Sequence, residues 1–329
     1  MKTLHLIIGG AGFVGSNLAT SLLLSKYNKV EIIDDLSRGR LNYIEKCLSS
    51  NNCDFRHINV ANYNDCDKLF SNYSLENFFE VVIWHLAANS DIPAGIDDIY
   101  VDFERTFETT VSLLAGMKKY GVKKINFASS SAIYGNHGMQ PLHEDMGCCQ
   151  PISNYGAMKL ASEAIISAAC ESFLEKALIF RFPNVIGVPA THGVIYDFVS
   201  RLVKSQEKLT VLGNGTQQKS YLHVTDLVMA MNFMHNNSCD NTKFQVVNIG
   251  PKDDGICVSE IAQIVCQLFE PVPEIQFGIE PRGWVGDVPK FSYNTQKITD
   301  LGWEPKLGSK EAIKLASSQI LAQLKFEND

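Results

Sequence analysis

The sequence predicts an α/β protein built on a doubly wound parallel sheet, and three observations carry that prediction. Short apolar runs alternate with longer amphipathic segments through the first half of the chain. A glycine-rich turn follows the first apolar run. After about Arg181, glycine and proline become frequent, which indicates a smaller and more irregular C-terminal region. Strand–helix alternation of this kind favours a parallel sheet covered by helices on both faces.

The elements follow one another in a regular order. Apolar runs predict strands over 4–8, 29–33, 55–60, 80–86, 124–129 and 177–182. Helical spacing of apolar residues predicts helices over 16–25, 103–120 and 155–174. A short strand and a helix over 221–236, then a strand over 244–249, are expected to return to the first domain.

This order predicts two discontinuous domains. The first takes residues 1–186 and about 218–250, and the second takes about 187–217 and 251–329. A chain of 329 residues is long enough to give both an ample core.

Composition excludes several classes of function. The net charge of −7 gives no electrostatic reason to expect nucleic acid as a partner. No apolar run reaches the roughly 18 residues that a membrane span needs, so no membrane partner is expected. None of the nine cysteines falls in a CxxC pair, so no metal site is expected. The short N-terminal apolar stretch ends in glycines, unlike a signal peptide, and the protein is expected in the cytoplasm.

The glycine-rich turn has the spacing of a dinucleotide-binding turn. Gly9, Gly12 and Gly15 lie between the first predicted strand and helix, where glycine allows backbone to approach a pyrophosphate. Asp34 follows 19 residues after Gly15, at the end of the second strand, where a carboxylate can hold the adenosine ribose hydroxyls. That carboxylate would repel a 2′-phosphate and favours NAD over NADP, although Arg38 nearby weakens the preference.

A second group of residues fits proton transfer. Tyr155 and Lys159 are four residues apart in a predicted helix and so share one face. A neighbouring ammonium can stabilise a phenolate, which would let Tyr155 take a proton from a hydroxyl. Ser130 lies at the end of the fifth strand, the edge at which parallel sheets bind ligands.

With these features the chain resembles the extended short-chain dehydrogenases/reductases of the nucleotide-sugar epimerase/dehydratase family, and UDP-glucose 4-epimerases most of all. The resemblance covers nearly the whole chain. It is carried by GGAGFVGS (9–16), DDLSRG (34–39), HLAA (85–88), SSSAIYG (129–135), YGAMK (155–159), RFPNVIG (181–187) and RGWVGD (282–287). It implies a Rossmann sheet that binds NAD and a smaller domain that binds a nucleotide sugar.

The resemblance also implies residue roles. Ser130, Tyr155 and Lys159 match the catalytic group. The implied cofactor site comprises Gly9, Gly12, Phe13, Val14, Gly15, Asp34, Asp35, Ser37, Arg38, Asn59, Val60, Leu86, Ala87, Ala88, Tyr155, Lys159 and Pro183. The implied substrate site comprises Ser130, Ser131, Asn184, Val194, Tyr196, Lys219 and Arg282.

Some positions depart from the family pattern. Ser131 and Ala132 stand where 4,6-dehydratases carry an Asp-Glu pair, so dehydration is not expected. Other departures are Ile8 for threonine, Asn59 for aspartate, Met158 for Ser/Thr and Lys219 for arginine. Lysine keeps the charge of arginine but loses its bidentate contact with phosphate.

The function expected from these residues is oxidation and reduction at C4 of a nucleotide-linked sugar by an NDP-sugar 4-epimerase. The alternative is an NAD-dependent 4-dehydrogenase that releases the keto sugar. A hypothesis of another class is a non-catalytic NAD-sensing regulator, although such proteins often lose the Tyr/Lys pair. The resemblance further implies a homodimer formed through the 103–120 helix and the helix that carries Tyr155.

Overall fold

The computed structural model describes residues 2–71, 77–138, 140–147, 149–238, 242–280 and 291–328. The chain divides into two compact units. The first unit comprises Met1–Tyr134, Cys148–Arg181 and Met231–Val247, and the second comprises Gly135–Gly147, Phe182–Ala230 and Asn248–Asp329. These bounds differ from the predicted domains chiefly around residues 135–147 and 218–230, both of which lie in the second unit.

The first unit is built on a seven-stranded sheet, which confirms the predicted doubly wound parallel architecture. Its strands are β1 (Thr3–Ile8), β2 (Asn28–Asp34), β3 (Cys53–His57), β4 (Glu80–His85), β5 (Lys124–Ala128), β6 (Lys176–Arg181) and β11 (Phe244–Asn248). They lie in the order β11-β6-β5-β4-β1-β2-β3, and every pairing from β3 to β6 is parallel. The order reverses between β1 and β4, which is where doubly wound sheets bind their ligands.

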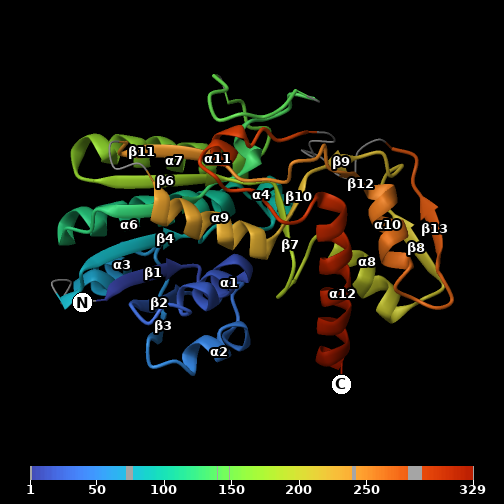
Figure 1. Ribbon diagram of the computed structural model, residues 1–329, viewed down its shortest axis with the longest axis horizontal. Helices are drawn as coiled ribbons and strands as arrows, with labels where there is room; N and C mark the ends of the chain where they lie inside the picture. The colour runs from blue at the N-terminus through green and yellow to red at the C-terminus, as the bar shows by residue number, and fades with distance from the viewer. Residues whose placement is uncertain are drawn as a thin grey trace. The chain divides into compact units, whose positions relative to one another are not determined.

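Helices cover both faces of this sheet (Figure 1). One face packs against α3 (Tyr63–Ser71), α6 (Thr109–Tyr120) and α7 (Asn154–Ser172), and apolar residues of these helices and of the strands form one buried cluster. The other face carries α1 (Phe13–Leu22), with α2 (Glu45–Leu48) packed against it, and the part of α9 (Val224–Asn237) from Met231 onward. Burial on both faces explains why the strand sequences are almost continuously apolar.

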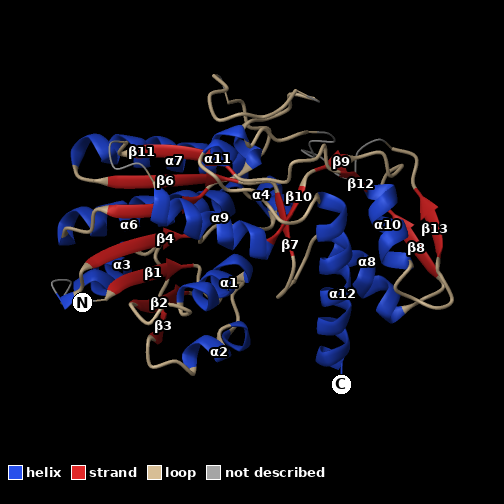
Figure 2. Cartoon of the chain, in the orientation of Figure 1, coloured by secondary structure: helices blue, strands red, loops and turns tan. Residues whose placement is uncertain are grey.

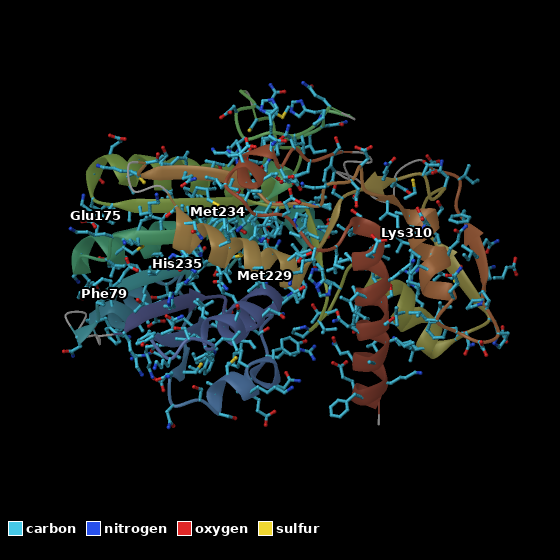
Figure 3. The ribbon with its side chains drawn as sticks, in the orientation of Figure 1. Phe79, Glu175, Met229, Met234, His235 and Lys310 are labelled. Atoms are coloured by element: carbon cyan, nitrogen blue, oxygen red, sulfur yellow. The ribbon has the colours of Figure 1, made fainter. Side chains whose placement is uncertain are left out.

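Three rings fix α9 to the sheet. The indole Nε1 of Trp84 in β4 donates a hydrogen bond to Nδ1 of His5 in β1 at 3.0 Å. His235 of α9, labelled in Figure 3, packs edge-on to both rings, and its ring centre lies 5.2 Å from that of Trp84 and 5.7 Å from that of His5. Burial, followed by the charge of His235, lowers the pKa of His5 to about 4, and burial also lowers the pKa of His235.

The helix predicted over 103–120 is present, but its first third is not α-helical. Phe103–Glu108 forms a π-helical turn, η3, and α6 begins only at Thr109. The Thr106 carbonyl accepts hydrogen bonds from the hydroxyls of Thr109 and Thr110. Hydroxyls inserted into the backbone ladder in this way disturb regular α-helical bonding. Two short helices precede this turn, α4 (Ile92–Asp97) and α5 (Ile99–Asp102).

The second unit contains more regular structure than its sequence suggests (Figure 2). Its buried core lies among α8 (Val194–Lys204), α10 (Val258–Cys266) and α12 (Ser309–Asn328). Short strand pairs complete it: β8 (Lys208–Val211) with β13 (Glu274–Phe277), β9 (Gln218–Lys219) with β12 (Ile256–Cys257), and β7 (Asn184–Ile186) with β10 (Tyr221–His223). The remaining short helices of the described chain are η1 (Leu41–Tyr43), η4 (Ser131–Ile133) and α11 (Gln296–Asp300).

The segment expected to return to the first domain as a strand does not join its sheet. β10 pairs in parallel with β7 in the second unit. The sheet edge beside β6 is already occupied by β11, which leaves no free edge at that strand. The chain therefore returns to the first unit only within α9.

Replacing Phe70 with alanine tests the core beneath α3. Phe70 is fully buried in the cluster between the sheet, α3 and α6, so Phe70→Ala is expected to lower the free energy of unfolding by about 3–5 kcal/mol. Phe79 is 77% exposed, and Phe79→Ala is expected to change it by no more than about 0.5 kcal/mol (Figure 3). Chemical denaturation of both variants gives the comparison, and equal losses would contradict the packing described.

Candidate functional site

The start of α7 places Tyr155 and Lys159 one turn apart. The Ser153 hydroxyl caps the helix by accepting the Gly156 N–H at 3.1 Å. Lys159 is 1% exposed, and its Nζ donates a hydrogen bond to the Ala128 carbonyl at 2.6 Å. The same Nζ lies 5.9 Å from the centre of the Tyr155 ring. The lysine is therefore anchored to the end of β5 and directed along one side of the tyrosine.

Ser130 completes this group. It follows β5 directly and caps η4, where its hydroxyl accepts the Ala132 N–H at 3.2 Å. Its side chain also hydrogen-bonds to Tyr155. The structure thus brings Ser130, Tyr155 and Lys159 together at the carboxyl end of β5, in the part of the sheet that the sequence singles out.

The surroundings move both pKa values in this group. Burial raises the pKa of Tyr155 to about 12, although the Ser130 hydrogen bond opposes that rise. Burial lowers the pKa of Lys159 to about 7, and the charge of Glu163 opposes that fall. The protein's own groups therefore do not lower the pKa of Tyr155 toward 7, as the sequence suggests, because desolvation outweighs the stabilisation of the phenolate.

A buried carboxyl near Tyr155 escapes sequence reasoning. Asp102 is fully buried at the end of α5, and its Oδ1 accepts a hydrogen bond from Asn89 Nδ2 at 2.9 Å. Burial raises the pKa of Asp102, and its charge in turn raises the pKa of Tyr155. An acidic residue between Val101 and Phe103 in an apolar helical stretch is the signal that could have revealed it.

His85 at the end of β4 has a structural position. Its Nε2 hydrogen-bonds to the Thr110 hydroxyl at 2.9 Å, and the residue is fully buried. Burial, and then the charge of Lys159, hold the pKa of His85 well below its usual range. The ring is therefore neutral, and it ties β4 to α6 beside the predicted cofactor residues Leu86, Ala87 and Ala88.

The glycine turn packs too closely for any larger residue. A Cβ on Gly9 would lie 2.7 Å from the Ala87 backbone nitrogen, and one on Gly15 would lie 2.4 Å from the Gly9 carbonyl oxygen. Gly9 also has φ +77°, which favours glycine. Helix α1 begins at Phe13 without a side-chain cap, so the N–H groups of its first turn have no acceptor within the helix. These donors suit a pyrophosphate.

Asp34 fixes the same turn to the end of β2. Its carboxylate accepts the Ala11 N–H at 3.0 Å and the Leu36 N–H at 2.9 Å. Burial raises the pKa of Asp34. A carboxylate has about four acceptor positions, so two backbone bonds leave it capacity for ribose hydroxyls.

The neighbouring predicted residues form a small polar loop. Asp35 accepts the backbone N–H and the hydroxyl of Ser37, at 2.9 and 2.6 Å. Arg38 Nη1 lies 3.5 Å from Asp91 Oδ2. Asn59 accepts the Ala61 N–H at 3.0 Å, and Val60 is buried.

A cavity beside this loop can accommodate a nucleoside. Its volume is about 630 Å³, and its lining includes the predicted residues Asp35 and Asn59 together with His57, Ile58, Asp65 and Lys68. Small-molecule pockets commonly measure roughly 300–1,000 Å³. The glycine turn, Asp34 and this cavity together fit a dinucleotide, whereas His57 and Lys68 are lining residues that sequence reasoning missed.

Another cavity, of about 400 Å³, lies at the opposite edge of the sheet. It is lined by residues at the amino ends of three strands, Glu80, Lys124 and Lys176, and by Glu175 and His235 among others. It contains none of the predicted site residues. Parallel sheets bind ligands at the carboxyl ends of their strands, so we place the functional site at that edge.

The remaining predicted residues belong to the second unit. Pro183 is buried and Asn184, the first residue of β7, is exposed. Val194 and Tyr196 lie in the first turn of α8, and Lys219 ends β9. Each of these last three is partly exposed. Arg282 lies outside the described residues.

Neither a metal cluster nor a membrane span emerges from the described part of the chain. In residues 2–71, 77–138, 140–147, 149–238, 242–280 and 291–328, no three His, Cys, Asp or Glu side chains are grouped to hold a metal ion. Among the helices of the same residues, none is long and apolar enough to cross a membrane.

Known proteins share both the sequence and the fold. A model of the NAD dependent epimerase/dehydratase family matches residues 5–250. The UDP-glucose 4-epimerase of Corynebacterium glutamicum is 28% identical over 317 residues, covering 92% of this chain and 90% of that protein. A crystal structure of a UDP-galactose 4-epimerase matches with TM-score 0.83 and 30% identity over 98% of this chain and 99% of the other. The UDP-glucose 4-epimerase of Thermus thermophilus in complex with NAD matches with TM-score 0.82 and 25% identity over 96% and 98%.

A doubly wound sheet that carries a Ser–Tyr–Lys group at its ligand-binding edge defines a dinucleotide-dependent enzyme of the extended short-chain dehydrogenase/reductase class. Within that class, the chain belongs to the NAD dependent epimerase/dehydratase family. NAD is accordingly its cofactor, which confirms the prediction made from the glycine turn and Asp34.

The glycine turn predicts a specific loss of NAD affinity. In Gly15→Ala the new methyl would meet the Gly9 carbonyl and displace the turn, so NAD is expected to bind at least about tenfold more weakly. Gly147→Ala is the matched control, because a Cβ there meets nothing within 4 Å. Isothermal titration calorimetry measures both affinities, and unchanged NAD binding by a folded Gly15→Ala protein would exclude this turn from the cofactor site.

Proposed function

We propose that the enzyme is an NDP-sugar 4-epimerase, with a UDP-sugar as the first candidate substrate. The observation that carries the proposal is the Ser130–Tyr155–Lys159 group, followed by Ser131 and Ala132 in place of a second acid–base pair. The names of two of the relatives described above support the choice of C4 and of UDP, because those proteins are a UDP-glucose and a UDP-galactose 4-epimerase.

Each residue has a chemical task in the proposed reaction. Tyr155 accepts the proton of the sugar 4-hydroxyl, and Ser130 hydrogen-bonds to the same oxygen. When bound, NAD supplies the hydride acceptor, the later hydride donor and a positive charge. Lys159 adds its own charge beside the phenol ring. After the 4-keto sugar presents its other face, Tyr155 returns the proton to O4 and the inverted sugar leaves.

The pKa of Tyr155 explains why charge is needed at this site. A phenol with a pKa of about 12 is a poor base near neutrality, so the phenolate requires nearby positive charge. Lys159 has a pKa of about 7 and is therefore only partly protonated at neutral pH. Its ammonium form is the one that stabilises the phenolate.

The roles given to the second unit and to assembly are also proposals. Asn184, Val194, Tyr196 and Lys219 are proposed to bind the nucleotide part of the substrate. A homodimer through α6 and α7 is proposed because apolar side chains stay exposed along α4, α5, η3 and α6, namely Ile96, Ile99, Tyr100, Phe103 and Val111. A location in the cytoplasm stays a prediction.

A substrate panel tests the proposed function directly. The purified protein with added NAD is incubated with UDP-, GDP-, CDP- and dTDP-sugars while NADH absorbance is followed and the products are identified by NMR. A C4-inverted product without lasting NADH is expected. Stoichiometric NADH with a released keto sugar would instead identify a 4-dehydrogenase, and NAD and sugar binding without any turnover would favour an NAD-sensing regulator.

Tyr155→Phe tests the proton transfer. Removal of the phenolic hydroxyl is expected to lower kcat by at least about 100-fold, because general acid–base catalysis contributes roughly 10²–10⁴-fold. NAD affinity should change little, and calorimetry provides that control. Turnover at the wild-type rate would remove Tyr155 from the mechanism.

A further inference from the structure

The helix α7 and the end of β5 meet in a regular series of contacts. Tyr155, Lys159 and the next residue on that face, Glu163, follow one another at intervals of four and so project from one side of the helix. Tyr155 bonds to Ser130, and Lys159 bonds to the Ala128 carbonyl. Glu163 accepts a hydrogen bond from the hydroxyl of Ser129, the residue between Ala128 and Ser130. Three consecutive residues at the end of β5, Ala128 to Ser130, are thus each bonded to a different residue of α7.

Glu163 is itself fixed by a buried arginine. It is 4% exposed, and Arg181 at the end of β6 contacts both of its oxygens, with Nε 3.0 Å from Oε1 and Nη2 2.7 Å from Oε2. Arg181 also donates from Nη1 to the hydroxyl of fully buried Tyr134 at 3.1 Å. Tyr134 follows η4, whose cap is Ser130. This network therefore links β6 and α7 to the residues on either side of the segment that carries Ser130.

A buried ion pair needs a reason other than stability. Its desolvation cost can equal its attraction, and apolar replacements of such pairs are often neutral or stabilising. The bidentate pairing of Arg181 instead gives Glu163 one fixed geometry. The fixed carboxylate accepts the hydrogen bond of the Ser129 hydroxyl. It also places a negative charge one helical turn from Lys159.

The groups around Lys159 are few and definable in the described structure. On its own helix it faces Tyr155 and Glu163. From β5 it meets the Ala128 carbonyl and the Phe127 ring, and from β4 it interacts with neutral His85. Arg181 of β6 is paired with Glu163, and Asp102 of α5 acts on Tyr155. Glu163 is the group whose charge supports the protonated lysine.

We propose that Glu163 is a positioning residue of the reaction, which holds Ser130 in register with Tyr155 through Ser129 and places its carboxylate one helical turn from Lys159. The turnover measurements below rest on the proposed function, whereas the measurement of the Lys159 pKa does not. Removing the carboxylate charge would lower the pKa of Lys159, so a rate that depends on the ammonium would fall at a lower pH. A purely structural residue would lower the rate by the same factor at every pH.

Glu163→Gln tests the charge without requiring a substrate. The Lys159 Nζ resonance is followed against pH in ¹⁵N-lysine-labelled protein, and its assignment rests on its loss in Lys159→Arg. The pKa of Lys159 is expected to fall by about one unit in Glu163→Gln and to stay near the wild-type value in Glu163→Asp, which keeps the charge. An unchanged pKa in Glu163→Gln would overturn the proposal whichever substrate the enzyme uses.

Turnover separates the two parts of the role. With a substrate from the panel, the alkaline limb of kcat/KM should move down by about one pH unit in Glu163→Gln. Ser129→Ala keeps the charge and loses the hydroxyl bond, so kcat should fall several-fold at every pH while that limb stays in place. Wild-type kcat in Ser129→Ala would overturn the positioning part.

A double variant guards against misfolding. Glu163→Gln leaves Arg181 buried without its partner, which can unfold the protein. Glu163→Gln combined with Arg181→Gln removes both charges together, and a smaller fall in the Lys159 pKa is expected there, because loss of the Arg181 charge opposes the loss of the carboxylate. If no sugar of the panel is turned over but the Lys159 pKa falls as expected, only the proposed function is contradicted. If a sugar is turned over but the Lys159 pKa does not change, only the role of Glu163 is contradicted.

Discussion

The close approach of the glycine turn to two neighbouring strands is the constraint on which the cofactor edge depends. Gly9 lies against the backbone after β4, and Gly15 lies against Gly9, with no space for a Cβ at either position. Asp34 then fixes the turn to β2 through two backbone N–H groups. Because the turn is joined to β1, β2 and β4, the helix donors and the cavity lined by Asp35 and Asn59 lie at fixed positions on the sheet.

The catalytic edge depends on a different kind of constraint, the burial of charge. Lys159 and Glu163 are both almost fully buried, yet each has specific partners. Burial of Lys159 lowers its pKa, and burial of Tyr155 raises the pKa of the phenol. Because the pKa of Tyr155 is high, formation of the phenolate depends on added positive charge. A bound oxidised nicotinamide provides such a charge. Packing and proton chemistry are therefore linked through the same helix.

Much of the first unit could be predicted from sequence because its signals are local. Apolar runs marked the strands, and the glycine turn with Asp34 marked the cofactor edge. The π-helical turn at Phe103–Glu108 could not be predicted from apolar spacing, which does not distinguish it from an α-helix; threonine hydroxyls bond to the Thr106 carbonyl within it. The pairing of β10 with β7 depended on which sheet edge was already occupied.

The candidate site divides in the same way. Ser130, Tyr155 and Lys159 were predictable because motif and periodicity agree, and the structure brings them together. Asp102 and Glu163 were not, because their importance comes from burial and from partners distant in the chain. Helices α8, α10 and α12 lay within a region whose glycine and proline content suggested irregular structure, although their apolar faces share one core.

The ring cluster of His5, Trp84 and His235 makes the stability of the first unit sensitive to low pH. Both histidines have folded-state pKa values below the usual one for the unfolded chain. An unfolded chain therefore binds more protons than the folded one once the pH falls below about 6.5, and stability declines from there as the pH approaches about 4. His235 belongs to α9, the helix through which the chain returns to the first unit. Low pH therefore weakens the packing of this returning helix on the sheet.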